Sequence, residues 1–138
     1  MVLAFVVVLA LPPLDAFATV QRKAAKKRTV TVTKTVVGPL VPCHKWGPIK
    51  VAVKVAQTKT TVGATTTVTA LKILSVTVPV VPNHTVRSVF INQKALPLLV
   101  GEVMQLQSDK IEAIAGATNT TDSFKQSLSA ALLAANKP

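Results

Sequence analysis

The residues of this chain best suited to chemistry form a Gly-Ala-Thr turn near the C-terminus. Gly116, Ala117 and Thr118 follow a short apolar segment, and residues 119–121 lead into an amphipathic stretch. A phosphate needs several converging N–H donors. Glycine permits close approach of the backbone, and the first N–H groups of a helix lack intrahelical partners. The pattern therefore predicts a phosphate site, with the threonine hydroxyl as a candidate for a covalent bond.

The same residues also fit an ordinary helix start. Asn119 or Thr121, followed by Asp122 and an apolar helix, is a typical N-cap arrangement. Such a cap stabilises a helix by about 1 kcal/mol without any ligand. The residues of the turn alone leave both interpretations open.

Three alternating segments predict the strands that precede this turn. Thr29 to Val37, Ile49 to Val55 and Val68 to Val78 show the period of two that is typical of half-buried strands. In the second segment the isoleucine and the three valines should face one way. Residues 57–67 are polar and contain Gly63, so we expect a loose hairpin connection there.

Helical spacing begins after residue 83. Leu98, Leu99, Val103 and Leu106 recur at helical intervals, and Pro97 either starts a second helical stretch or kinks a longer one. Gln107, Ser108 and Asp109 end this unit, and Ile111, Ala113 and Ala115 form a very short strand or an extended lead-in. A last helix should begin near Thr121 and align Phe124, Leu128 and Leu132. Strands followed by helices predict an α+β fold, an antiparallel sheet of several strands followed by helices in a single domain.

Charge and composition restrict the possible functions. The 138 residues carry a net charge of +11, with one basic block at residues 22–28, but only four Phe, one Trp and no Tyr. Binders of single-stranded nucleic acid stack bases on aromatic side chains, so we expect no nucleic-acid partner and interpret the block as a solvated linker. A weaker alternative is nucleic-acid or membrane binding through this block. Because Cys43 is the single cysteine, the chain cannot form an internal disulfide. Together with His44 and His84 it provides too few potential ligands for a zinc site.

The N-terminus resembles a secretory signal. Residues 2–11 are apolar, prolines follow, and an Ala-x-Ala pattern ends at Ala18. We therefore predict a signal segment at residues 1–18, a basic Thr/Val linker or first strand at 19–36, and a location outside the cell or on the extracytoplasmic face of its membrane. The basic block follows the apolar run and none precedes it. Either a basic segment lies upstream of residue 1, or residues 2–18 are a buried segment of a cytoplasmic protein.

Residues 37–138 resemble a known cofactor domain. The run Glu112-x-x-Ala115-Gly116-Ala117-Thr118 is similar to Asp-x-x-Ser/Thr-Gly-Ala-Thr of the FMN-binding domain. That domain occurs in the sodium-translocating NADH:quinone oxidoreductase, in the Rnf electron-transport complex and in small actinobacterial single-domain flavoproteins. Trp46-Gly47-Pro48 and residues 91–99 add to the likeness. Two departures are Ala115 in place of a hydroxyl residue and Glu112 in place of aspartate.

The resemblance implies a small extracytoplasmic flavoprotein for electron transfer. In that family a flavin transferase esterifies the motif threonine with the phosphate of FMN, which here would be Thr118. The implied partners are this transferase and an unidentified redox protein, and the basic charge of the chain could in addition favour an anionic membrane surface. The implied cofactor-binding residues are Trp46, Glu112, Gly116, Ala117, Thr118, Asn119, Thr120 and Thr121. The alternative is a structural or interaction domain that keeps the fold without flavin.

Several nearby residues have a simpler interpretation. A second Gly-Ala-Thr, at residues 63–65, lies between two strand patterns and should be a hairpin loop. Trp46 could pack against the flavin ring, but a tryptophan at a strand start is more often a core residue. Arg87, Asn92 and Lys94 could approach the flavin or its phosphate, but solvated helix positions are the more common explanation for each.

Overall fold

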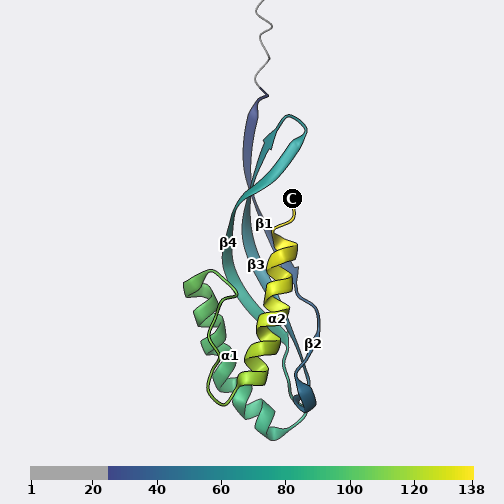
Figure 1. Ribbon diagram of the computed structural model, residues 1–138, viewed down its shortest axis with the longest axis vertical. Helices are drawn as coiled ribbons and strands as arrows, with labels where there is room; N and C mark the ends of the chain where they lie inside the picture. Colours follow the sequence, from purple (N-terminus) through teal and green to yellow (C-terminus); the bar gives the residue numbers. More distant parts are fainter. Residues whose placement is uncertain (1–24) are drawn as a thin grey trace, which may run out of the picture.

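The strand β3 (Pro48–Val62) organises the sheet, because every other strand pairs with it. The computed structural model describes residues 25–138 (Figure 1). β1 (Lys27–Val37) pairs antiparallel with residues 52–62, and β4 (Thr65–Val80) pairs with residues 50–62. The short β2 (Val41–Pro42) pairs with residues 48–49. The predicted antiparallel sheet is confirmed, whereas the predicted signal segment lies outside the described residues.

Two helices cover one side of this sheet (Figure 1). They are α1 (Val86–Leu106) and α2 (Thr118–Ala135), and they follow the strands in the chain, so the predicted α+β fold is confirmed. Neither helix has the length and apolar character needed to cross a membrane. The core joins all the elements: β3 contributes Ile49, Val51, Val53 and Val55, α1 contributes Leu99 and Val103, and α2 contributes Phe124 and Leu128. The β3 residues predicted to face one way are all fully buried.

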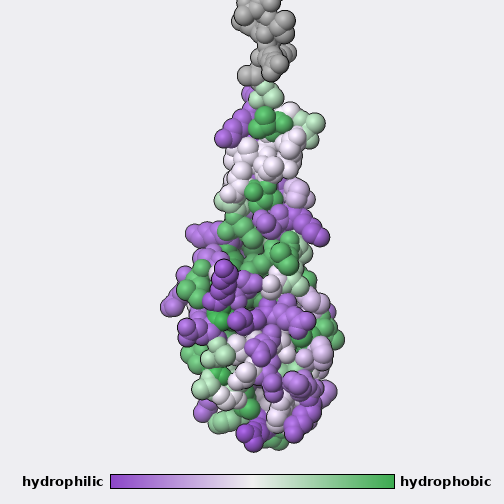
Figure 2. All heavy atoms as spheres, viewed as in Figure 1, coloured by the Kyte–Doolittle hydropathy of each residue, from purple (hydrophilic) through white to green (hydrophobic). Residues whose placement is uncertain are grey.

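The predicted loose connection at residues 57–67 is wrong. β3 continues to Val62 and β4 begins at Thr65, so that only Gly63 and Ala64 form the turn. Threonine suits a strand despite its polarity, and cross-strand hydroxyl pairs form here, such as Thr61 with Thr66 at 3.0 Å. Gly63 has a φ of 64°, which a tight hairpin turn requires. The resulting hairpin extends beyond the helices, and its threonines make it pale in Figure 2.

α1 runs without interruption through Pro97, so the single longer helix is the correct alternative. Buried residues lie on both sides of the proline, with Ala95 and Leu99 nearest to it. Their packing holds both halves in one helix and offsets a cost of about 3 kcal/mol for an internal proline. The first turn is closed by a capping box between Thr85 and Ser88.

No strand forms at residues 111–115. The backbone N–H of Glu112 donates to Glu102 Oε1, and the N–H of Ile114 donates to Thr121 Oγ1. The side chains of Glu102 and Thr121 therefore accept hydrogen bonds from N–H groups that, in a strand, would donate to a neighbouring strand. Residues 111–115 form the extended lead-in, which is the other predicted alternative. α2 then begins at Thr118 rather than near Thr121. Its predicted apolar stripe is confirmed, with Phe124 and Leu128 fully buried.

Gly38 allows α2 to lie close to the chain between β1 and β2. A Cβ atom on Gly38 would overlap the carbonyl oxygen of Ser127. The Ser127 hydroxyl donates to Pro39 O at 2.8 Å and accepts from Val51 N at 3.0 Å. This contact therefore joins the middle of α2 to the sheet.

A matched pair of glycine substitutions tests this close approach. Gly38→Ala should lower the free energy of unfolding by about 1–3 kcal/mol, since backbone must move to admit the methyl group. Gly101→Ala should raise it by about 0.5–1 kcal/mol, because Gly101 lies in α1 with open space at its Cβ position. Chemical denaturation measures both. Equal effects would contradict the tight packing of α2 at Gly38.

Candidate functional site

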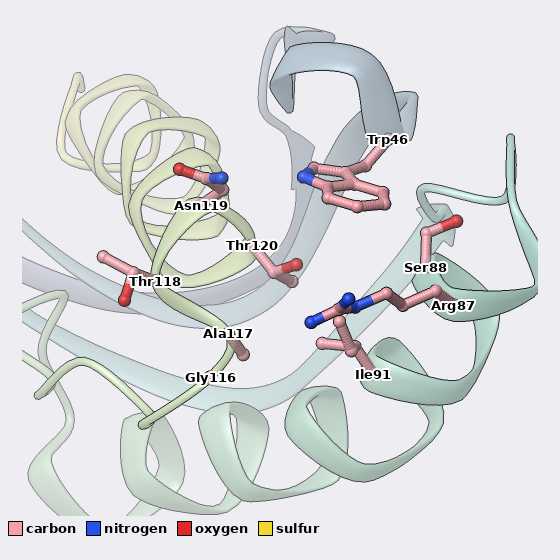
Figure 3. Close-up of a pocket in the computed structure, with 9 residues that line it drawn as sticks. All are labelled: Trp46, Arg87, Ser88, Ile91, Gly116, Ala117, Thr118, Asn119 and Thr120. Atoms are coloured by element: carbon pink, nitrogen blue, oxygen red, sulfur yellow. The ribbon is translucent and has the colours of Figure 1, made fainter.

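A cavity of about 220 Å³ lies where the first turns of α1 and α2 approach the 3₁₀ turn His44–Trp46 (Figure 3). It brings together six of the eight residues predicted as cofactor-binding. Glu112 is exposed and does not line the cavity, and neither does the fully buried Thr121. The lining residues are Trp46, Arg87, Ser88, Ile91, Gly116, Ala117, Thr118, Asn119 and Thr120.

The N-terminus of α2 has no side-chain cap. Ala117 occupies the N-cap position and makes no such bond, so the predicted caps at Asn119 and Thr121 are wrong. The first helical hydrogen bond runs from Thr121 N to Ala117 O at 2.9 Å. The N–H groups of residues 118–120 therefore lack intrahelical acceptors. They lie at the border of the cavity, where the helix dipole favours an anion.

The hydroxyls at this helix start differ in their availability. Thr120 Oγ1 donates to Asn92 Oδ1 at 3.0 Å, and Thr121 Oγ1 donates to Ala117 O at 3.0 Å. Both side chains are buried. Thr118 is exposed, and its hydroxyl has no hydrogen-bond partner in the described part of the chain. Of these three threonines, only Thr118 presents a free hydroxyl to solvent.

The backbone and the hydroxyl of Thr118 face different sides of the helix start. Figure 3 shows its hydroxyl directed away from Trp46 and the Arg87 guanidinium. Its backbone borders the cavity, whereas its hydroxyl faces solvent on the other side of the helix start. Because the Thr118 side chain is exposed, it can adopt other rotamers, and rotation about its Cα–Cβ bond changes the side that the hydroxyl faces.

Arg87 and Trp46 form the opposite walls of the cavity. The guanidinium extends toward the start of α2, and the indole ring lies across from it (Figure 3). Trp46 is half-buried rather than a core residue. The backbone places it there: Trp46 N donates to Cys43 O at 3.0 Å, and His84 N donates to Trp46 O at 3.1 Å. No acidic residue lines the cavity, which is therefore electropositive.

Two of the three residues expected to be solvated helix positions have other roles. Arg87 is exposed but lines the cavity, and Asn92 is buried. Besides accepting from Thr120, Asn92 donates its Nδ2 to Pro82 O at 2.7 Å. It thus connects α1 to the first turn of α2. Lys94 is exposed, and its Nζ lies 4.3 Å from the centre of the Phe90 ring.

Sequence reasoning missed Ser88 and Ile91 as lining residues. Helical spacing could have identified Ile91, because Arg87 and Ile91 are four residues apart and share one face of α1. The hairpin predicted at the second Gly-Ala-Thr is confirmed, because Thr65 starts β4 directly after the turn. Within residues 25–138, no cluster of three potential metal-ligating His, Cys, Asp or Glu side chains occurs.

A second cavity, of about 210 Å³, adjoins the first across the Gly116 turn. The two share Ile91, Gly116 and Ala117. The second is lined largely by apolar side chains, including the exposed Phe90 and Leu98. A ligand with an anionic end and an apolar body matches this pair of neighbouring surfaces.

No protein-family model and no curated protein matches this sequence. What the site can bind therefore follows from its own donors, charge and shape. Those features suit an anionic group.

A double-mutant cycle tests whether Asn92 holds the start of α2. Asn92→Ala and Thr120→Val should each destabilise the protein, because each leaves a buried polar partner unsatisfied. Their coupling energy in chemical denaturation should be about 0.5–3 kcal/mol.

The control cycle pairs Asn92→Ala with Ser127→Ala, which shares no hydrogen-bond partner with Asn92. These two effects should add within about 0.5 kcal/mol. Additivity in the Asn92–Thr120 cycle as well would contradict the proposed connection.

Proposed function

We propose that this protein is a small extracytoplasmic flavoprotein that carries FMN for electron transfer, with the flavin phosphate attached to Thr118. One observation carries the proposal. Thr118 has a solvent-facing, unbonded hydroxyl at an uncapped helix start, beside a cavity that contains an arginine. The resemblance of residues 112–118 to the FMN-binding motif supports the same assignment.

The charge of the cavity suits the phosphate. Arg87 can form paired hydrogen bonds with phosphate oxygens, and such charge-assisted bonds are roughly twice as strong as neutral ones. The unpaired N–H groups of residues 118–120 provide further donors. A volume of about 220 Å³ is smaller than ordinary sites for whole cofactors, which hold about 300–1,000 Å³. The flavin ring would therefore lie outside this cavity, against Trp46 or the apolar neighbouring cavity.

Covalent attachment requires an activated phosphate donor and an external enzyme. Thr118 Oγ1 would attack the phosphorus of the FMN half of a flavin dinucleotide. The phosphoanhydride bond breaks, AMP leaves, and a base on the transferase takes the hydroxyl proton. An exposed hydroxyl is accessible to such an enzyme, as buried Thr120 and Thr121 are not. The attached flavin supplies the redox chemistry, while the protein supplies binding and orientation.

An interaction domain without flavin is the second candidate. Two observations favour it: Ala115 lacks the hydroxyl found at this position in the motif, and large apolar side chains are exposed nearby. Phe90 is 58% exposed and Leu98 is 61% exposed. Flavin incorporation separates the two candidates.

Intact mass spectrometry tests the attachment site. Protein co-expressed with a flavin transferase should gain the mass of one FMN minus one water, on the peptide that contains Thr118. Thr118→Ala should remove the addition, whereas Thr118→Ser should keep part of it because the nucleophile remains. The matched control is Thr65→Ala in the second Gly-Ala-Thr, which should leave the yield unchanged. Absence of flavin in every sample would favour the interaction domain, and addition at Thr65 would refute the assignment.

Non-covalent binding tests the role of Arg87 separately. In the Thr118→Ala background, Arg87→Gln should weaken the affinity for FMN by about tenfold or more, since a charged hydrogen bond is lost. Lys110→Gln removes the same charge from an exposed position outside the cavity and should have little effect. Isothermal titration calorimetry measures both. Equal losses would mean that only the overall charge matters.

A further inference from the structure

The charged residues of the described chain are distributed unevenly between its two layers. The strands carry seven basic residues and no acidic residue. The acidic residues of the described chain all lie in the helices or the segment between them: Glu102, Asp109, Glu112 and Asp122. The sheet is therefore cationic, whereas the helical layer carries both signs.

Strand pairing determines which of these basic residues lie on the side without helices. Directly paired residues share one side of a sheet. Thr35 pairs with Lys54, and Ala56 pairs with Lys72, on the side opposite to the buried Val53 and Val55. Lys50 precedes Lys54 by four residues and shares this side, about 13 Å away at ordinary strand spacing.

Threonines occupy most of the remaining positions on this side. Thr29 and Thr31 of β1 lie opposite Thr60 and Thr58 of β3, with hydroxyl oxygens 3.4 and 3.2 Å apart. We call this surface the lysine–threonine face, defined by Lys50, Lys54, Lys72, Thr29, Thr31, Thr33, Thr35 and Thr58.

We propose that the lysine–threonine face binds the anionic headgroups of a phospholipid membrane. Lysine is a mobile point charge that suits a diffuse anionic surface, whereas arginine would suit fixed, paired recognition. The face has no aromatic residue on which nucleic-acid bases could stack. It also lacks the aromatic or arginine anchors that dominate protein interfaces. Charge complementarity therefore selects lipid headgroups as the occupant.

This orientation leaves the candidate site accessible. The helices lie on the opposite side of the sheet, and the cavity is lined by residues of these helices, by the turn before α2 and by Trp46. A membrane beneath the sheet would therefore leave the start of α2 open to solvent and to other proteins. The inference does not depend on flavin binding, because none of its residues lines the cavity.

Vesicle co-sedimentation of the full chain tests the face. The protein should bind vesicles of phosphatidylcholine mixed with phosphatidylglycerol and bind those of phosphatidylcholine alone far more weakly, and added salt should weaken the difference. The triple variant Lys50→Gln, Lys54→Gln and Lys72→Gln should bind the mixed vesicles about a hundredfold more weakly. The matched control is Lys94→Gln, Lys110→Gln and Lys125→Gln, which removes the same charge from the helical layer and should cause a much smaller loss.

A labelled variant gives a second measurement that keeps the lysines intact. An environment-sensitive fluorophore at Thr33→Cys should shift to the blue on mixed vesicles, whereas the same fluorophore at Leu133→Cys on α2 should not. Cys43 is buried and should remain unlabelled. Equal losses from the two triple variants, equal shifts from the two labels, or tighter binding to duplex DNA than to mixed vesicles at the same salt would overturn the proposal.

Discussion

The packing of α2 across β3 is the constraint on which the rest of the structure depends. Phe124 and Leu128 are fully buried against the valines of β3, which sets the distance between helix and sheet. Hydrogen bonds at regular intervals then set the position of the helix along its axis. Ser123 Oγ donates to Pro42 O, and Ser127 Oγ donates to Pro39 O. A shift by a fraction of a turn would lengthen both bonds, so the start of α2 has little freedom to move.

The C-terminal end of α2 is held by the same strand system. Gln57 is fully buried, and its Nε2 donates to Ala135 O at 2.9 Å and to Lys137 O at 2.8 Å. Lys34 Nζ donates to Lys137 O at 3.2 Å, which places a positive charge at the negative end of the helix dipole. With both the middle and the end of the helix fixed, the first turn can lack a cap. The missing cap costs about 1 kcal/mol, which is small compared with the free energy that burial of the apolar face of the helix contributes.

Local sequence patterns predict much of this structure, although the polarity of residues 57–67 conceals the ends of two strands, and contacts between elements decide where α2 begins. Alternation at residues 49–55 is a local signal, and all the predicted inward residues are buried. The start of α2 was misplaced because Asn119 and Thr121 are good caps in isolation. In the folded chain Thr121 lies inside the helix and accepts from Ile114 N, so a contact outside the helix overrides the local preference.

The candidate site shows the same division. The Gly-Ala-Thr turn could be found from residue types, since its chemistry depends on neighbours in the chain. Arg87 and Asn92 could be named only as an alternative to solvated positions, because their roles arise only when α1 lies beside α2. Asn92 had a detectable signal: its spacing from Ala95 and Leu99 places it on the buried stripe of α1. A polar residue on such a stripe needs a buried partner, and Thr120 and Pro82 provide it.

The exposed sheet also explains why basic residues and threonines are so common in the strands. A long edge strand such as β1 presents unpaired backbone groups that can pair with another chain. Lys27, Arg28 and Lys34 place like charges along this edge and oppose such pairing. On β4, the side chain of Gln107 bonds both Ile73 N and Ile73 O, at 2.8 and 3.2 Å, and so occupies part of the edge. Positive charge on the strands therefore opposes pairing of this edge with another chain, and the same charge is the basis of the membrane contact proposed for the helix-free side.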